Sequence, residues 1–372
     1  MKILELFGGI GACTTALKRL GIPYEIADYV EIDKYAVASY NAINGTNFKP
    51  QDICEWDKDI ECDLIMHGSP CQDFSVAGKQ AGGDENSGTR SSLMYETLRI
   101  VAKLKPKYVI WENVKNLLSH KHRHNFDNYL NRMNELGYEN HYQVLNAKDY
   151  GIPQNRERVF TISIRNDIEK EFVFPEKQEL KLRLKDMLEP QVDEKYYLSE
   201  KMLNYIAADN EKWTGNNEKS IINKTIASAR NTGEGSRRCD ASNYVAKPYE
   251  KAINIKNAVE LKSNNKRLET LVNNTEFEQG KILNMDLYNQ TTNENISQCL
   301  TEPHHNSQAL YDGLRIRKLT PKECWRLMGF NDEEFEKAQA VNSNEQLYKQ
   351  AGNSIVVNVL VEIFKNLLGG TQ

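Results

Sequence analysis

The chain has 372 residues, seven cysteines and a nearly balanced charge, with a formal net charge of −4 at pH 7. This length can bury a large core and predicts two domains. The balanced charge excludes a globally basic nucleic-acid-binding protein. The cysteines form no CxxC pair or His/Cys cluster of the zinc-binding kind, so we expect no metal and free thiols in a reducing cytoplasm. No apolar run reaches membrane-spanning length and the first residues lack signal-peptide form, so we expect no membrane contact.

Strand and helix patterns alternate along the first 165 residues. Short apolar runs typical of buried strands occur at Lys2–Phe7, Tyr24–Val30, Leu64–His67 and Tyr108–Trp111. Helical patterns lie between them at Ala12–Leu20, Lys34–Ile43 and Leu93–Leu104. This order predicts an α/β fold of the doubly wound, Rossmann-like kind, with a mostly parallel sheet and helices on both faces. Two more strand patterns, Tyr142–Leu145 and Val159–Ile164, are joined by a polar loop and predict an antiparallel pair at the sheet edge.

The character of the chain changes after about residue 175. Residues 180–312 are rich in Asn, Lys, Glu and Ser and have few clear periods, which predicts a smaller, irregular domain of loops and short strands. Its part 205–270 is mildly basic, although a solvated surface explains such a charge equally well. Apolar patterning returns at Leu319–Phe330 and Gln346–Leu368. We therefore expect one domain over 1–175, a second domain with a hinge over 176–340, and a C-terminal helix over 341–372 that returns to the first domain.

A cysteine follows the strand pattern Leu64–His67 on a loop of turn residues, Gly68-Ser69-Pro70-Cys71-Gln72. Open α/β sheets place their chemistry on loops that leave the carboxyl ends of strands. A thiol there can act as a nucleophile if its surroundings favour the thiolate. An isolated cysteine is more often buried packing, so the assignment depends on the other motifs.

The segment Glu5-Leu6-Phe7-Gly8-Gly9-Ile10-Gly11 is similar to a dinucleotide-binding turn but lacks its third glycine. Glu31 lies twenty residues after Gly11, at the end of the second strand, where a carboxylate suits ribose hydroxyls. Asp52 is expected at the end of the third strand, where it can accept a hydrogen bond from an adenine amine. A plain strand–turn–helix is the alternative for the turn alone. Together these residues indicate an adenosine ligand, with S-adenosylmethionine favoured over NAD.

Three further patterns carry ionisable or turn residues. Glu112 follows the strand Tyr108–Trp111, and burial beside Trp111 would raise its pKa so that the carboxyl can donate a proton; a helix-terminal acid is the alternative. Arg156 and Arg158 are two residues apart entering a strand, so both should point to one face and suit a carbonyl, phosphate or carboxylate. Solvated charge on an exposed strand face is their alternative. The turn Gly352-Asn353-Ser354 opens an apolar helix and reads as its N-cap.

These motifs, in this order, resemble those of the bacterial and phage DNA (cytosine-5) methyltransferases. The resemblance covers about residues 1–165 and 313–368, and residues 180–312 have the character of that family's target-recognition region. The matching segments are Pro70-Cys71-Gln72, Glu112-Asn113-Val114, Gln154-Asn155-Arg156-Glu157-Arg158, Leu319–Phe330 and Gly352-Asn353-Ser354.

The resemblance implies methyl transfer from S-adenosylmethionine to C5 of a cytosine flipped out of a specific double-stranded DNA sequence. Cys71 would bond covalently to C6, Glu112 would donate a proton to N3, and Arg158 would hold O2 with support from Arg156. The implied cofactor contacts are Phe7, Gly9, Ile10, Gly11, Glu31, Ile32, Asp52, Ile53, Pro70, Leu93, Asn353 and Ser354. The implied DNA contacts are Gln72, Ser75, Lys79, Arg90, Arg237 and Arg238. We expect a monomer in the cytoplasm of a bacterium or phage-infected cell, with any cognate restriction endonuclease acting separately.

Two alternatives stay open. One is a transfer-RNA cytosine-5 methyltransferase, against which the long second domain and the lack of a Cys-Phe-Thr segment argue. The other is a non-catalytic nucleic-acid-binding module that kept the fold, against which the intact Cys71, Glu112, Arg156 and Arg158 argue.

Overall fold

The computed structural model describes residues 1–70, 84, 87, 89–197, 283–286, 291–294, 297–298, 308–311 and 316–369. The chain divides into two compact units. The first consists of Met1–Ile152, Arg156–Lys181 and Met328–Gln372, and the second of Pro153–Asn155 and Leu182–Leu327. The sequence predicted domain boundaries near residues 175 and 340, with a catalytic role for the first part and DNA recognition for the second. These boundaries and roles stay a prediction.

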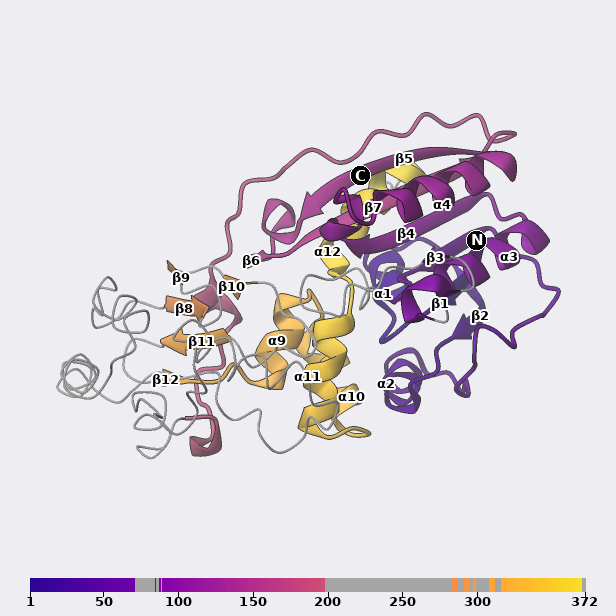
Figure 1. The fold of residues 1–372 in the computed structure, drawn as a ribbon. Helices are drawn as coiled ribbons and strands as arrows, with labels where there is room; N and C mark the ends of the chain where they lie inside the picture. Colours follow the sequence, from indigo (N-terminus) through magenta and orange to yellow (C-terminus); the bar gives the residue numbers. More distant parts are fainter. Residues whose placement is uncertain are drawn as a thin grey trace, which may run out of the picture. The chain divides into compact units, whose positions relative to one another are not determined.

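The first unit contains a six-stranded sheet with the strand order β2-β1-β3-β4-β7-β5 (Figure 1). Its strands are β1 (Lys2–Leu6), β2 (Glu25–Val30), β3 (Leu64–His67), β4 (Tyr108–Val114), β5 (Tyr138–Asn146) and β7 (Glu157–Arg165). The pairs β1–β2, β1–β3 and β3–β4 are parallel. β7 runs antiparallel to both of its neighbours, β4 and β5. The predicted α/β fold and antiparallel pair are confirmed, and the reversed strand lies one place in from the edge.

Helices cover both faces of this sheet. The α-helices of the unit are α1 (Ala12–Arg19), α2 (Lys34–Asn44), α3 (Met94–Leu104), α4 (Arg123–Glu135), α10 (Asp332–Gln339), α11 (Asn344–Asn353) and α12 (Val357–Phe364), which continues as a π-helical turn over Lys365–Gly369. Short 3-10 helices occur at Arg90–Leu93, Lys115–Leu118 and Ala147–Tyr150. The sequence of α3 shows why such a segment packs on the sheet as a helix. Its apolar residues Met94, Leu98 and Val101 recur at helical spacing and are all buried.

Alternation along β1 separates the two faces. Leu4 and Leu6 belong to an apolar core that also contains Trp111 of β4 and side chains of α3 and α4. Glu5 points the other way, towards α2, where it accepts a hydrogen bond from Tyr40. Each fully buried large apolar side chain contributes about 1.5–3 kcal/mol, so this core is the main source of the unit's stability.

The segment Asn344–Gly369 is long and apolar enough to span a membrane by length and composition alone. It is interrupted between α11 and α12, and α12 packs against α1 with Leu360, Ile363 and Phe364 fully buried. We therefore interpret it as a pair of core helices that returns the end of the chain to the first unit.

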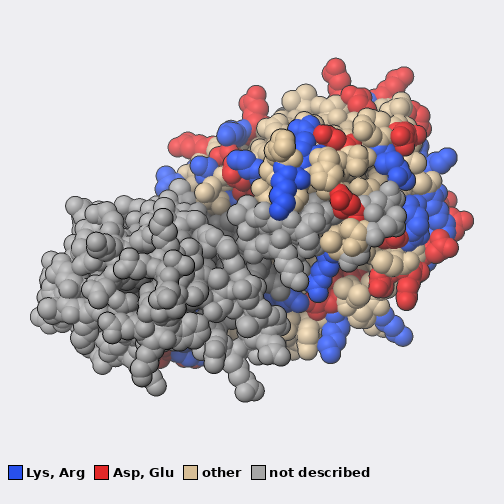
Figure 2. Space-filling model, in the orientation of Figure 1, with Lys and Arg blue, Asp and Glu red and all other residues tan. Residues whose placement is uncertain are grey.

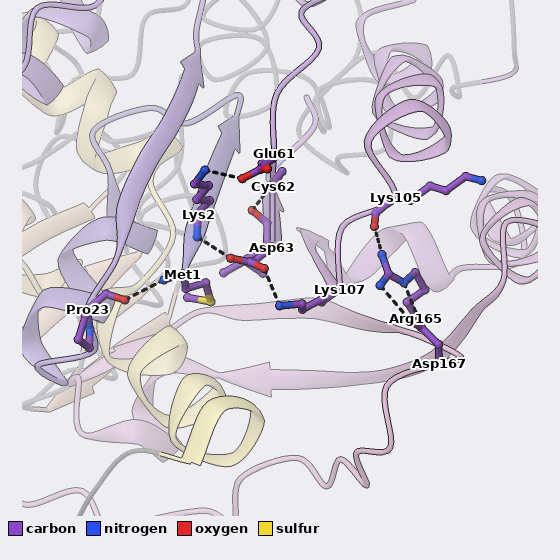
Figure 3. Close-up of polar contacts among 11 residues, drawn as sticks. Met1, Lys2, Pro23, Glu61, Cys62, Asp63, Lys105, Lys107, Arg165 and Asp167 are labelled. Atoms are coloured by element: carbon purple, nitrogen blue, oxygen red, sulfur yellow. Dashed lines mark hydrogen bonds and ion pairs between the residues drawn. The ribbon is translucent and has the colours of Figure 1, made fainter.

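Polar contacts tie the amino ends of the parallel strands together (Figure 3). The backbone N–H of Lys2 donates to Asp63 Oδ2 at 2.8 Å, and Lys107 Nζ lies 2.8 Å from Asp63 Oδ1. Asp63 thus links the starts of β1, β3 and β4. This edge of the sheet is occupied by structural contacts, whereas the carboxyl edge carries the loops described below.

The described parts of the second unit contain short strands, two 3-10 helices and one α-helix. An antiparallel sheet with the order β12-β11-β8-β9 contains β8 (Leu283–Asp286), β9 (Thr291–Glu294), β11 (Gln308–Tyr311) and β12 (Ile316–Arg317). β6 (Gln154–Asn155) pairs with β10 (Ser297–Gln298), short 3-10 helices occur at Leu184–Met187 and Glu194–Tyr196, and α9 spans Pro321–Leu327. Arg317 and Glu323 form a buried ion pair at 2.7 Å, and Glu323 also accepts the N–H of Glu189. Arg237 and Arg238 lie outside the described residues.

Candidate active site

Three residues in the turn between β1 and α1 have positive φ angles. Phe7, Gly9 and Gly11 have φ values of 53°, 53° and 85°. A Cβ at Gly11 would lie 2.8 Å from Thr14 Oγ1 and 2.9 Å from the Tyr40 ring, so only glycine fits. Phe7 adopts a left-handed conformation that aromatic residues rarely take, which marks a strained turn of the kind found at ligand sites.

This turn lines a hollow to which distant parts of the chain contribute. Phe7, Gly9 and Ile10 line it together with Asn353 and Ser354. These five are among the expected cofactor contacts, and that role stays a prediction. Glu112 also lines this hollow, and so does Gly68, which precedes the Cys71 loop. The hollow therefore joins the glycine turn of β1, the carboxyl end of β3, strand β4 and the junction of α11 and α12. Glu5, the first residue of the glycine segment, lines it too, although it was not among the expected cofactor contacts.

Glu31 follows β2 and holds the glycine turn in place. Its Oε2 accepts the N–H of Gly9 at 3.2 Å and its Oε1 accepts the N–H of Asp33 at 2.8 Å. Burial raises the pKa of Glu31, while the two backbone donors act in the opposite direction. Ile32 beside it is 67% exposed. A carboxyl group next to an exposed apolar side chain could bind the hydroxyl groups of a ribose and pack against the flat face of an attached base.

Asp52 does not lie at the end of a strand, so that expectation was wrong. Among residues 45–63, all of which the structure describes, the chain forms turns and loops before β3. Asp52 instead starts a turn, in which its Oδ1 accepts the N–H of Cys54 at 2.9 Å. The N–H of Gln51 donates to the Glu31 carbonyl at 2.9 Å, which places Asp52 beside the end of β2. Ile53 is buried in the core, and Leu93 packs against the same core.

Glu112 lies within β4 rather than after it, because β4 is three residues longer than the sequence pattern indicated. β7 pairs with β4 as far as Val114, whereas β3 ends opposite Trp111. Glu112 therefore stands beyond the end of its parallel neighbour, at the carboxyl edge of the sheet. It is 8% exposed, and an ideal Cβ on Gly68 would be 3.7 Å from its Oε2. One carboxyl oxygen is thus directed towards the loop that leads to Cys71.

The two arginines have different partners. Arg158 Nε lies 3.1 Å from Glu112 Oε1 in a largely buried ion pair. Burial raises the pKa of Glu112, and the guanidinium groups of Arg158 and Arg156 oppose that shift. Arg156 is buried just before β7, and its Nη2 donates to the carbonyls of Gly352 at 3.2 Å and Ser354 at 2.7 Å. Arg158 thus pairs with the carboxyl group of Glu112, and we call this pair the carboxyl site. Arg156 stabilises the junction of α11 and α12.

The expected N-cap at Gly352-Asn353-Ser354 was also wrong. α11 ends at Asn353, Ser354 follows it, and α12 begins at Val357 without a side-chain cap. Arg156 instead donates to carbonyls at the carboxyl end of α11, so a charged side chain from a distant segment caps the end of one helix where the sequence predicted the start of another.

The start of the cysteine loop is fixed by β4. Trp111 Nε1 donates to Ser69 Oγ at 3.0 Å, and Asn113 Nδ2 donates to the Ser69 carbonyl at 3.2 Å. Trp111 also stacks on His67, whose pKa burial lowers to about 3, so His67 is neutral. Sequence reasoning missed Trp111 and Ser69, although alternation in β4 places 111 and 113 on one face. Cys71, Gln72, Ser75 and Lys79 lie outside the described residues; Pro70 is described just before them, and Arg90 begins a 3-10 helix after them.

Comparison with known proteins matches residues 1–369 to the family described as C-5 cytosine-specific DNA methylase. The chain belongs to this family. The enzyme is 33% identical to the orphan methyltransferase M.SPRI of Bacillus phage SPR, over 99% of this chain and 97% of that protein. It is also 33% identical to the type II methyltransferase M2.ScrFI of Lactococcus lactis subsp. cremoris, over 99% of both chains.

Among solved structures, a DNMT2 variant from Spodoptera frugiperda has a TM-score of 0.62 and 23% identity, over 99% of both chains. This likeness shows a shared fold. The family match establishes the enzyme as a DNA (cytosine-5) methyltransferase, related to the methyltransferases of restriction-modification systems.

Proposed function

We propose that this enzyme transfers a methyl group from S-adenosylmethionine to C5 of a cytosine flipped out of a specific duplex DNA sequence. The observation that carries the proposal is Glu112. Its carboxyl group is buried, is paired with Arg158, and is directed towards Gly68, three residues before Cys71. A proton donor, a cation and a nucleophile-bearing loop at one edge of the sheet match what C5 methylation needs.

The residues around the hollow fit S-adenosylmethionine. Glu31 would bind the ribose hydroxyls, exposed Ile32 would cover one face of the adenine, and Asp52 beside them would accept from its amine. Bound there, the cofactor would supply a methyl group on a cationic sulfur. The remaining proposed contacts are Phe7, Gly9, Ile10, Gly11, Ile53, Pro70, Leu93, Asn353 and Ser354.

The chain's own residues would activate the base. Cytosine C5 is a poor nucleophile, and the Cys71 thiolate adds to C6, breaking the C5=C6 π bond and moving its electron pair towards C5 and N3. Glu112 gives its proton to N3, and Arg158 holds O2, with Arg156 supporting the site from behind. As C5 bonds to the methyl group, the bond between that methyl group and sulfur would break with its electron pair left on sulfur, and N3 returns its proton to Glu112. A base then removes the C5 proton, and the freed electron pair reforms C5=C6 and expels the Cys71 thiolate.

Glu112 must enter this reaction protonated. Burial raises its pKa and so favours the acid, whereas the ion pair with Arg158 favours the carboxylate. A cytosine O2 that accepts from Arg158 would weaken this ion pair and leave the proton on Glu112. The geometry therefore supports a carboxyl whose acidity depends on the presence of the base.

The target atom cannot be reached inside a duplex, so the base must leave the helix. We propose that residues 176–340 read the DNA sequence, with Arg237 and Arg238 among the contacts. Gln72, Ser75, Lys79 and Arg90 would contact DNA from the catalytic side. Charges of both signs are interspersed on the described surface in view (Figure 2), which fits recognition by a local site rather than a globally basic face. We further propose that the enzyme acts as a monomer in the cytoplasm, with any cognate endonuclease acting separately.

The test is tritiated methyl transfer from S-adenosylmethionine to duplex DNA and, in parallel, to transfer RNA. We expect label in DNA as 5-methylcytosine, and none with Cys71→Ser. Label confined to transfer RNA would replace this proposal by the RNA alternative. Label in neither nucleic acid, from a folded wild-type enzyme, would refute it.

A further inference from the structure

Glu5 is an acidic residue that the proposed reaction does not use. It lies on β1 immediately before the glycine turn and lines the same hollow as Gly9 and Glu112. Its side chain is 1% exposed, so it forms part of the wall of the hollow rather than its rim. An acid in such a position is costly unless something compensates its charge.

The compensation among the described residues is only partial. Tyr40 of α2 donates its hydroxyl to Glu5 Oε1 at 2.8 Å, and Thr14 of α1 also lowers the pKa of this carboxyl group. No cation of the described chain pairs with this carboxyl. Burial raises the pKa of Glu5 to about 7, and the hydrogen bonds oppose this shift.

The other titratable groups that face Glu5 are neutral near pH 7. Cys13 comes from α1, Tyr29 from β2, Tyr40 from α2 and Tyr24 from the segment before β2, and the pKa of each is raised, with burial as the main cause. On this face of β1 the buried carboxyl of Glu5 therefore lies in otherwise neutral surroundings. Two more carboxyl groups whose pKa burial raises are near the hollow: Glu112 lines it from β4 and is paired with Arg158, and Glu31 accepts the N–H of Gly9. A positive charge entering the hollow would act on the Glu5 carboxyl through a medium of low dielectric constant.

We propose that Glu5 is the counter-charge by which this site distinguishes the cationic sulfonium of S-adenosylmethionine from the neutral thioether of S-adenosylhomocysteine. The inference rests on the proposed cofactor. Glu5 releases its proton when the sulfonium is bound and stays mostly protonated with the thioether. The site consequently loses affinity for its ligand once the methyl group has been transferred, which assists release of the product.

Calorimetric titration of the full-length enzyme tests this without turnover. S-adenosylmethionine and S-adenosylhomocysteine are each titrated at pH 6 to 8, in buffers of different ionisation enthalpy, so that proton release is measured. We expect S-adenosylmethionine to release close to one proton more than S-adenosylhomocysteine at pH 6. Its affinity should rise roughly fivefold to tenfold from pH 6 to pH 8, the range set by a group that titrates near neutrality.

Substitutions assign the proton to its source. Glu5→Gln preserves size and hydrogen bonding, and should remove the additional proton and lower the preference for S-adenosylmethionine at pH 8 by roughly tenfold. Tyr40→Phe keeps the ring that stacks on Tyr29 at 3.8 Å but removes the donor to Glu5. It should therefore shift the pH dependence upwards.

Tyr138→Phe is the matched control. It removes another buried tyrosine hydroxyl, which donates to the Pro106 carbonyl at 2.7 Å, and should leave the preference unchanged. Equal proton release with both ligands in the wild-type enzyme would overturn the inference, as would an undiminished release in Glu5→Gln. If Glu5→Gln does not fold, the inference is tested by the difference in proton release between the two ligands in the wild-type enzyme and by the pH dependence of Tyr40→Phe. Failure of the wild-type enzyme to bind either ligand is a separate result and would refute the proposed cofactor itself.

Discussion

Arg156 and Arg158 should respond differently to the same substitution, although they are neighbours in the chain. Arg156→Met removes the donor to the carbonyls of Gly352 and Ser354, which are buried at the junction of α11 and α12. A hydrogen bond from a charged group contributes about 1.5–3 kcal/mol, so losing two of them costs about 3–6 kcal/mol. That is a large part of the 5–15 kcal/mol by which a typical domain is stable.

Arg158→Met removes the partner of Glu112 instead. Because burial already raises the pKa of Glu112, the carboxyl can take up a proton rather than stay charged and unpaired. We therefore expect this substitution to cost less unfolding free energy than Arg156→Met, since it removes an ion pair whose remaining partner can become neutral. Methyl transfer should fall strongly in this variant, since in the proposed mechanism Arg158 is the donor to O2 of the base.

Urea unfolding of the full-length variants measures the first effect, and the turnover number with saturating cofactor measures the second. Arg156→Met should unfold at a clearly lower urea concentration than Arg158→Met. Arg156→Lys should lie between Arg156→Met and the wild-type enzyme, because one ammonium group lacks the guanidinium fork. Equal urea midpoints for the two methionine variants would refute the assignment of Arg156 to the junction and of Arg158 to the carboxyl site.

Four further predictions concern other parts of the site. Gly11→Ala should weaken S-adenosylmethionine binding at least tenfold and cost about 1–3 kcal/mol in unfolding free energy, since φ is 85° and the new Cβ would meet Thr14 at 2.8 Å. Duplex DNA with 5-fluorocytosine at the target should trap the enzyme in a denaturation-resistant adduct, and mass spectrometry should place the modification on Cys71. Glu112→Gln should slow methyl transfer by ~10²–10⁴-fold without preventing cofactor binding, and normal turnover in this variant would exclude its role as the acid. Burial raises the folded-state pKa of Glu5 from 4.5 to about 7, so the stability linked to this group is present below pH 4.5 and is lost as pH rises to about 7; the urea midpoint of Glu5→Gln, relative to wild type, should therefore be higher at pH 8 than at pH 5.

The sequence by itself determined the fold class and the family. The spacing of apolar residues indicates which segments are strands and which are helices, because it shows the face that each element buries. The alternation of strands and helices then predicts a parallel α/β sheet. The glycine turn after β1 was also readable, since only glycine adopts the angles of Gly11 without strain. Cys71, Glu112 and the two arginines could be predicted as catalytic residues because their motifs are contiguous in the chain and keep a fixed order.

Tertiary structure decided what depends on partners far away in the chain. β4 extends to Val114 because β7 pairs with it there. The pairing of these two strands cannot be read from the residues of β4 alone. Asp52 starts a turn beside β2 because the N–H of Gln51 donates to Glu31 just after that strand. Arg156 caps the carboxyl end of α11, where the sequence predicted the start of a helix.

Glu5 is the clearest case. In the sequence it is one acid before a glycine turn, with nothing to separate it from an exposed charge. Only the packing of α1, α2 and β2 around it removes water from the carboxyl and places it in the wall of the hollow. Desolvation depends on all the surrounding atoms together. The pKa of Glu5 could therefore be inferred only from the folded structure and not from the sequence.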